Sequence, residues 1–236
     1  MAESSLFKWR HYQPNIILCC VRWYLSYPLS YRQVEELITE RGLPVDHSTV
    51  FRWVQHYSPV LDKRCRRYLR PTNDSWRVDE TYIKVKEQWK YLYRAVDSAG
   101  NTLDFLLTAK RDARAAKRFF CKALKAGHNQ PPRVVTVDKN PAYPKAITEL
   151  KAEQALPQSV ELRPRRYLNN IVEQDHRFIK RLVKPGMGFG SFNTARRTIR
   201  GYEVMHMLRK GQVQGVAIGA VLERVRFIYQ IFAVAA

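Results

Sequence analysis

The sequence predicts a small all-α domain followed by a larger domain built on a mixed α/β sheet. Residues 15–57 carry apolar side chains at helical spacing. Residues 76–109 change to an alternation of period two, rich in β-branched and aromatic residues, which is typical of strands. The short run RVVTVD is an apolar stretch that ends in an acid, and such a short apolar run is typical of a buried parallel strand. This change of period places a domain boundary near residue 70.

The N-terminal part predicts three helices, over residues 15–27, 30–41 and 47–57. Pro28 ends the first helix because proline cannot continue the hydrogen-bond ladder. Ser30 with Gln33 three positions later forms a capping box at the start of the second helix, and Asp46 caps the third. The tight turn before the third helix is typical of a helix-turn-helix.

The third of these helices carries the residues that we expect to read DNA. Its apolar stripe leaves an outer face with hydrogen-bonding side chains near the N-terminal end, which suits base edges and phosphates. An ordinary three-helix bundle with a polar outer face is the alternative. The predicted DNA-binding residues of this face are His47, Ser48, Thr49, Arg52, Gln55 and His56.

The second part predicts strands first and then alternating strands and helices. Residues 76–109 read as a three-stranded antiparallel meander with a turn at 97–101. The order βββαβαβα predicts a mixed sheet covered by helices. The later elements are expected as a helix over 112–126, the strand RVVTVD, a helix over 142–153, a short strand over 160–162, and helices over 169–183 and 192–210.

The charge of the chain indicates a polyanionic partner. The 236 residues include 41 Lys or Arg and only 21 Asp or Glu, for a net charge of +20. Such an excess repels itself in a compact protein and favours nucleic acid binding. A basic protein tuned for solubility and a ribosomal type of protein are the alternatives. The densest basic segments are 63–70 and 163–200.

Cysteine usage argues against zinc and against a disulfide framework. The four cysteines form no CxxC pair, so we expect reduced thiols in a cytoplasmic, nucleoid-associated protein and no zinc. No signal peptide is visible, and the apolar runs are too short to span a bilayer.

Three acids stand out by their position in these elements. Asp79 lies in the middle of the first strand, Asp138 ends the buried strand, and Glu173 lies on the helix expected over 169–183. Phosphodiester hydrolysis and transesterification are served by two divalent ions that clamp the entering and leaving oxygens. Carboxylates are the ligands that Mg²⁺ prefers. The sequence therefore suggests a catalytic, metal-binding triad.

Other acids compete for these roles and are weighed by position. Glu80 should point to the opposite face of the strand from Asp79, and Asp175 should face elsewhere on its helix than Glu173. Asp97 and Asp104 lie near turns, where a structural role is usual.

Histidines and tryptophans are expected to have no direct part in the chemistry. We expect core or surface roles for the two lone helical histidines, His176 and His206. Core positions are expected, in preference to base stacking, for Trp9, Trp23, Trp76 and Trp89.

Cations flank the acids and are expected to hold DNA. Arg177 and Lys180 follow Glu173 at i+4 and i+7, on one helix face, and Lys139 directly follows Asp138. These three residues complete the predicted DNA-binding set.

The chain resembles the DDE transposases encoded by small bacterial insertion sequences that form cointegrates by replicative transposition. The resemblance covers residues 7–213 and is carried by SYRQVEELITERGLPVDHSTVFRWVQHY, WRVDETYIKV, TVDKNPAYPKAI and YLNNIVEQDHRFIKRL. The Asp–Asp–(34 residues)–Glu spacing, with a lysine seven positions after the glutamate, is the pattern of that family.

The resemblance implies a catalytic core similar to ribonuclease H and retroviral integrase. It implies Asp79, Asp138 and Glu173 as the three acids, and Lys180 as a contact to the terminal DNA of the element. The paired His and paired Cys of the integrase zinc module are absent, and a helix-turn-helix stands in their place.

We therefore expect a transposase that binds terminal inverted repeats, cleaves 3′ ends and joins them to target DNA with two Mg²⁺ ions, for which Mn²⁺ substitutes. Synapsis of two ends implies at least a dimer. The expected domains are residues 1–70 for DNA binding, 71–212 for catalysis and 213–236 as a tail. The tail offers a possible assembly surface formed by Phe227, Ile228, Ile231 and Phe232.

Two alternatives from the sequence stay open. A DNA-binding regulator would use the same helix-turn-helix, with the α/β part as a ligand sensor that needs no metal. A ribonuclease H-like nuclease would cleave without ever joining strands.

Overall fold

The computed structural model describes residues 5–8, 10–164 and 170–234. Trp9 and Asn169, which the sequence placed in the core and at a helix start, lie outside the described residues. The chain forms two compact units, Met1–Leu69 with Ile179–Ala236, and Arg70–Phe178. Each unit is described by itself.

The first unit is all-helical. Ser30 caps its second long helix: its hydroxyl accepts from the Gln33 amide at 3.2 Å, and the Gln33 side chain accepts from the Ser30 amide at 2.8 Å. Asp46 caps the third by accepting from the Ser48 amide at 2.8 Å. These caps satisfy amides that have no partner inside the helix. The elements are η1 (Ser5–Phe7), α1 (Pro14–Ser26), α2 (Tyr31–Thr39), α3 (His47–Cys65), η2 (Arg66–Tyr68), η4 (Lys184–Gly186), α7 (Phe192–Arg209) and α8 (Val221–Phe232).

Helix α3 is eight residues longer than the sequence predicted. It passes through Pro59 and ends at Cys65. Proline removes one backbone hydrogen bond inside a helix. Its apolar stripe nevertheless continues with Leu61 and Cys65, which are buried, and α3 packs along α7. Burial of this stripe offsets the lost bond, so the helix does not stop at Tyr57.

The C-terminal tail forms α8, which belongs to the core of the first unit. Phe227, Ile228, Ile231 and Phe232 are all buried within the chain. The Phe232 ring lies 6.0 Å from the rings of both Phe7 and Tyr57. The expectation that these four side chains form an assembly surface is therefore wrong, because they pack against their own chain.

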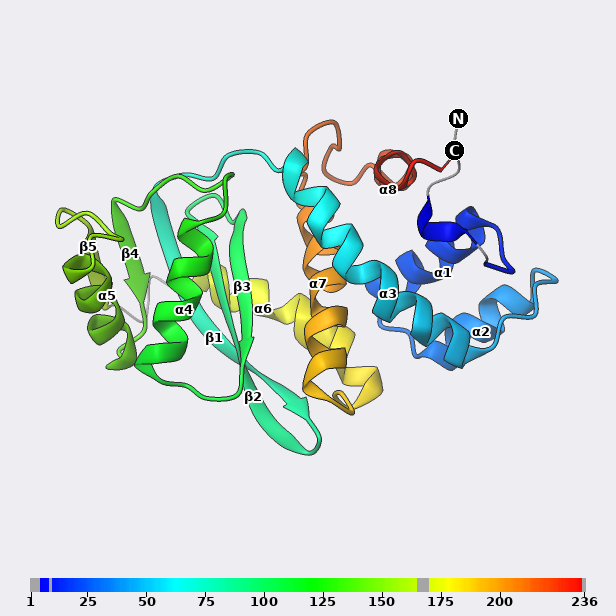
Figure 1. The fold of residues 1–236 in the computed structure, drawn as a ribbon, viewed down its shortest axis with the longest axis horizontal. Coiled ribbons are helices and arrows are strands. Elements are labelled where there is room, and N and C mark those ends of the chain that lie inside the picture. The colour runs from blue at the N-terminus through cyan, green and yellow to red at the C-terminus, as the bar shows by residue number, and fades with distance from the viewer. Residues whose placement is uncertain (1–4, 9, 165–169, 235–236) are drawn as a thin grey trace. The chain divides into compact units, whose positions relative to one another are not determined.

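The second unit contains a five-stranded mixed sheet of order β3-β2-β1-β4-β5 (Figure 1). Strands β1, β2 and β3 are antiparallel neighbours, whereas β4 pairs parallel to β1 and β5 parallel to β4. The meander and the buried parallel strand match the sequence prediction. The elements are β1 (Ser75–Val85), β2 (Gln88–Asp97), β3 (Thr102–Thr108), α4 (Ala113–Leu124), β4 (Val134–Val137), α5 (Ala142–Ala152), β5 (Glu161–Pro164) and the first part of α6 (Asn170–Val183).

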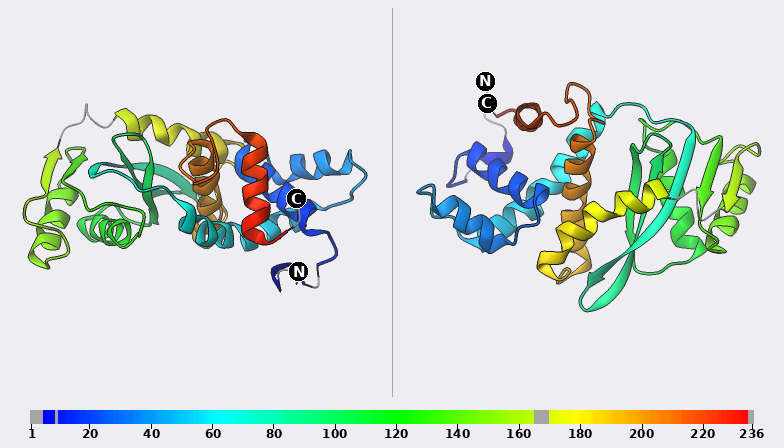
Figure 2. Two further views of the ribbon diagram at one scale, coloured as in Figure 1. Left: turned by 90° about the horizontal axis from the view of Figure 1, so that it is seen from above. Right: turned by 180° about the vertical axis from the view of Figure 1, so that it is seen from behind.

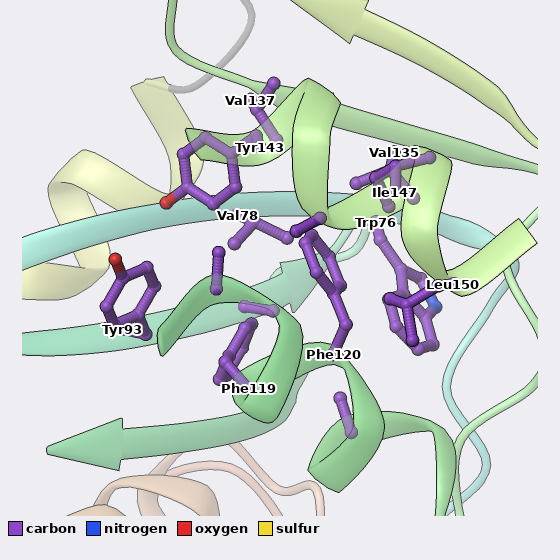
Figure 3. Packing of buried hydrophobic residues seen from close by; sticks show 14 of the residues in the cluster. Trp76, Val78, Tyr93, Phe119, Phe120, Val135, Val137, Tyr143, Ile147 and Leu150 are labelled. Atoms are coloured by element: carbon purple, nitrogen blue, oxygen red, sulfur yellow. The ribbon is translucent and has the colours of Figure 1, made fainter. Parts of the chain in front are cut away.

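Helices cover both faces of this sheet. Helices α4 and α5 pack on one face, where Trp76 and Val78 of β1 meet Phe119, Phe120 and Ile147 in a continuous apolar core (Figure 3). The first part of α6 lies on the opposite face of the sheet from α4 (Figure 2). Alternate residues of β1 consequently face two different environments.

The compact units differ from the expected domains in the C-terminal part of the chain, because residues from Ile179 onward, including the expected tail, belong to the first unit. The division at residue 70 agrees with the change of sequence period, but α7, expected in the catalytic part, packs on α3 in the first unit. Helix α6 continues across the division between Phe178 and Ile179. Within the described part of the chain, no helix is long and apolar enough to cross a membrane.

Candidate active site

Asp79 lies in the middle of β1 on the face covered by α6. Its carboxylate Oδ2 lies 3.1 Å from Nε2 of His176 on α6. The residue directly opposite Asp79 on β2 is Arg94, whose side chain is fully buried. Asp79 itself is partly exposed, so its carboxylate remains reachable from solvent.

A polar network formed by Arg94, Asp175 and His176 contacts Asp79. Arg94 Nη2 donates to Asp175 at 2.6 Å, and its Nη1 lies 3.4 Å from His176 Nδ1. Arginine has only donors, so His176 Nδ1 accepts from Arg94 and His176 Nε2 donates to Asp79. Burial lowers the pKa of His176, although the bond to Asp79 opposes this, which agrees with a neutral ring. The network holds the Asp79 carboxylate in one orientation.

Glu80, the next residue along β1, faces the other side of the sheet, as predicted. Its carboxylate is buried and accepts from the hydroxyl of Tyr143 on α5, from Asn140 Nδ2 at 3.2 Å, and from Arg111 Nε. Burial raises the pKa of Glu80, and the bonds from Tyr143 and Arg111 counteract this rise. Glu80 is thus a buried anchor for three neighbours.

Asp138 directly follows β4 and meets the same arginine. Arg111 Nη2 donates to Asp138 Oδ2 at 2.9 Å. Burial lowers the pKa of Arg111, but Glu80 and Asp138 outweigh that effect and raise it overall. The other oxygen of Asp138 accepts from the Asn140 amide at 3.0 Å, which fixes the turn after the strand. Arg111 therefore offsets the repulsion between two close carboxylates.

These elements bring Asp79, Glu80 and Asp138 together. One carboxylate oxygen from each lies within 4.8 Å of the others, which is close enough to hold a metal ion. Strand β1 supplies two of them, and the parallel pairing of β1 with β4 places Asp138 beside that strand. Only hard oxygen donors are present, which is the ligand type that Mg²⁺ prefers.

Glu173 does not belong to this group of three. It is exposed in the first turn of α6, one helical turn before His176. Residues three apart on a helix share a face, so Glu173 lies on the side of α6 that reaches Asp79 through His176. The structure thus brings the carboxylates of Asp79 and Asp138 within 4.8 Å of each other. The third predicted acid, Glu173, lies on the face of α6 that carries His176.

The predicted DNA-contacting cations are all accessible. Arg177, Lys180 and Lys139 are exposed. The exposed fractions do not test whether they bind DNA, so that role remains a prediction.

One residue of the predicted recognition face is placed differently. Gln55 is buried, with 8% of its surface exposed, and its Nε2 donates to Thr198 Oγ1 of α7 at 2.8 Å. The expectation that Gln55 reads DNA is therefore wrong, because its side-chain amide is buried between α3 and α7 and bonds to Thr198. On the same helix, Ser48, Arg52 and His56 are exposed, and His47 and Thr49 are partly exposed.

Sequence reasoning assigned no part at this site to His176 and Arg111. His176 was expected in the core or on the surface, and it is buried with a bond to Asp79. The only signal was its spacing of three positions from Glu173. Arg111 lies in the loop before α4, where nothing in the local pattern distinguishes it from other basic residues.

Comparisons with known proteins agree with this arrangement. Residues 73–212 match the family model of a DDE domain. The chain is 39% identical over 211 residues to the transposase for insertion sequence-like element IS431mec of Staphylococcus aureus strain Mu50, covering 87% of this chain and 89% of that protein. It is 38% identical, with the same coverage, to the transposase for insertion sequence element IS257 in transposon Tn4003 of Staphylococcus aureus.

Solved structures with a similar arrangement include the HTLV-2 integrase catalytic core domain in complex with magnesium. In its dimeric form the TM-score is 0.44, with 16% identity over 61% of this chain and 96% of that chain.

The family match covers more than half of the chain, and the relatives are similar over most of their length. The sheet order and the DDE match together confirm the predicted fold class, a mixed α/β catalytic core with N-terminal helices. The chain belongs to the DDE transposases of bacterial insertion sequences, enzymes of the polynucleotidyl transferase class.

Proposed function

We propose that the protein binds the terminal inverted repeats of its own insertion sequence, cleaves at their 3′ ends and joins those ends to target DNA by a replicative route. The observation that carries the proposal is the convergence of Asp79 and Asp138, from strands far apart in sequence, with oxygens within 4.8 Å. A regulator would have no need for such a group of carboxylates at the end of a strand.

The residues fit a pair of divalent ions. Asp79, Asp138 and Glu173 would hold Mg²⁺, with Mn²⁺ as a substitute, and both ions would activate the attacking hydroxyl and stabilise charge on the phosphate. Glu80 is a less suitable ligand, because its side chain is only 1% exposed and accepts from Tyr143, Asn140 and Arg111, whereas the side chain of Asp138 is 28% exposed. Glu173 is exposed and lies three positions before His176, on the face of α6 that carries the partner of Asp79.

The chain's own residues have three tasks in this mechanism. His176 holds the Asp79 carboxylate in place through its Nε2 proton. Arg111 keeps Asp138 beside Glu80 and limits their repulsion. The exposed cations Lys139, Arg177 and Lys180 bind DNA phosphates, which contribute affinity without sequence information.

Sequence-specific binding belongs, in this proposal, to α2 and α3. Ser48, Arg52 and His56 are exposed on α3, and Thr49 accepts from Arg52 Nη2 at 2.8 Å. A recognition helix that presents such residues at its N-terminal part is suited to the major groove. Bringing two element ends together requires at least a dimer, which acts on DNA in the nucleoid.

The experiment that tests the chemistry is strand transfer by Asp138→Asn. A linear DNA fragment carrying the element end is incubated with the full-length protein and Mg²⁺, and joined products are resolved on a denaturing gel. The variant should lose joining while it still binds the end in a gel-shift assay. Joining at the wild-type rate would exclude the proposed role of Asp138, and cleavage without any joining by the wild-type protein would favour a nuclease.

A further inference from the structure

The hairpin formed by β1 and β2 carries exposed aromatic side chains next to the carboxylates. Trp89 is 61% exposed and Tyr82 is 48% exposed, although the sequence placed Trp89 in the core. The Tyr82 ring lies 6.4 Å from that of Trp89 and 5.4 Å from that of Tyr91. We call Tyr82, Trp89 and Tyr91 the aromatic ladder.

The aromatic ladder is fixed rigidly relative to the carboxylates of β1, and strand alternation places it on the face of Glu80, opposite to that of Asp79. Pairing of β1 with β2 is continuous from Trp76 opposite Asp97 to Val85 opposite Gln88. A two-residue turn with positive φ at both positions closes the hairpin, a geometry that matches the twist of the strands. On the other face of the same strand, Ile83 and Val85 are buried, so the hairpin has one anchored face and one open face.

The distance along β1 matches the scale of a few nucleotides. Tyr82 lies two residues beyond Glu80 on the same face of β1, and Trp89 pairs with Lys84, four residues beyond Glu80. At about 3.4 Å per residue, the two rings lie roughly 7 and 14 Å along the strand from Glu80. A carboxylate oxygen of Glu80 lies within 4.8 Å of those of Asp79 and Asp138. Nucleotides of one DNA strand follow each other at about 3.4 Å, so these rings lie about two to four nucleotides from a phosphate at the carboxylates.

The surroundings of the aromatic ladder favour nucleic acid over protein. Lys84 lies on the same open face and pairs with Glu87, and Lys86 is exposed at the turn. Aromatic rings interleaved with lysines are a stacking platform beside phosphate-binding groups. Cross-strand stabilisation alone would not require Trp89 to expose most of its surface.

We propose that the aromatic ladder stacks against nucleobases of the DNA strand whose phosphate lies at Asp79 and Asp138, and so holds bases that are unpaired next to the reacting bond. This inference rests on the proposed function for the position of the DNA. It assigns to the catalytic unit a base-binding surface separate from the helix-turn-helix. Stacking of this kind accepts any base, so the aromatic ladder contributes no sequence preference.

The test uses a synthetic forked duplex with 2-aminopurine at the first unpaired position, and a matched fully paired duplex. Binding of the full-length protein should quench the 2-aminopurine on the fork. Trp89→Ala should weaken binding of the fork roughly 5- to 150-fold, the range expected for loss of one stacked base, and should leave the paired duplex nearly unchanged. Trp89→Phe should keep most of the quenching.

Tyr27→Ala provides the control, because Tyr27 is an aromatic residue of the first unit that is 44% exposed, close to the 48% of Tyr82. It should leave fork binding and quenching unchanged. The double variant Tyr82→Ala with Trp89→Ala changes only exposed side chains, so its circular dichroism spectrum should match the wild type. Full quenching by that folded double variant would overturn the proposal.

Two further results separate the possible outcomes. If the double variant quenches normally but sediments as a smaller species, the surface is a protein interface and the proposal is overturned. Asp138→Asn should quench like the wild type, because it leaves the aromatic ladder intact. Failure of the proposed function would appear as joining by Asp138→Asn, independently of quenching.

Discussion

Asp79 and Glu80 are neighbours in sequence and opposites in environment. Asp79 stands opposite Arg94 on β2, on the face covered by α6, and is partly exposed. Glu80 stands opposite Tyr93, on the face covered by α4 and α5, and is buried. Because strand residues alternate between faces, two identical charges one position apart receive different partners.

The comparison teaches that distance alone does not identify a metal ligand. Both carboxylates lie within 4.8 Å of Asp138. Glu80 already accepts from Tyr143, Asn140 and Arg111, whereas Asp79 has one described partner, His176, and keeps solvent access. The open carboxylate suits a ligand, and the satisfied one suits a structural anchor.

The largest expected effect separates these two roles directly. Asp79→Asn should reduce strand transfer by at least about 10³-fold, because it removes a metal ligand worth several kcal/mol in the transition state. Glu80→Gln keeps the hydrogen-bonding shape and should cost less than about tenfold, equivalent to about 1.4 kcal/mol. Initial rates of joined product measure both, and equal losses would contradict the assignment.

The next effect concerns the network behind Asp79. Arg94→Met should lower the free energy of unfolding by about 3–5 kcal/mol, because it leaves the Asp175 carboxylate without its buried partner. Urea denaturation followed by circular dichroism measures it. Arg163→Met is the control, since Arg163 forms an exposed ion pair with Glu161, and it should leave unfolding unchanged. Similar stability of Arg94→Met and the wild type would show that the network is unimportant.

Much of this site was predictable from local patterns. Alternation along β1 predicted that Glu80 faces away from Asp79, and the apolar run before Asp138 predicted a buried parallel strand. The capping box at Ser30 was also predictable, because its two bonds join residues three positions apart.

What the sequence could not predict depends on contacts between distant residues. Gln55 looked exposed because its partner Thr198 lies 143 positions away. Trp89 looked like a core residue because its size favours burial, but its place near a hairpin tip leaves it 61% exposed. The four apolar residues of α8 looked like an interface, since the sequence does not show that Phe7 and Tyr57 lie beside Phe232.

A smaller effect distinguishes the two sides of α3. Gln55→Ala should cost about 1–2 kcal/mol of stability, because it removes the buried hydrogen bond to Thr198, and should keep the affinity for DNA. Arg52→Ala should leave stability unchanged and weaken DNA binding. If Arg52 contacts a phosphate, the slope of the logarithm of the binding constant against the logarithm of the salt concentration should fall by about one. Fluorescence anisotropy at several salt concentrations measures the slope, and an unchanged slope would place Arg52 away from the phosphates.

Titration calorimetry with Mn²⁺ tests the central claim most directly, because it needs neither DNA nor catalysis. The wild-type protein should bind two ions per chain, Asp79→Asn and Asp138→Asn should each lose at least one, and Glu80→Gln should keep both. Absence of Mn²⁺ binding by the folded wild-type protein, or equal binding by the wild type and Asp79→Asn, would contradict the account.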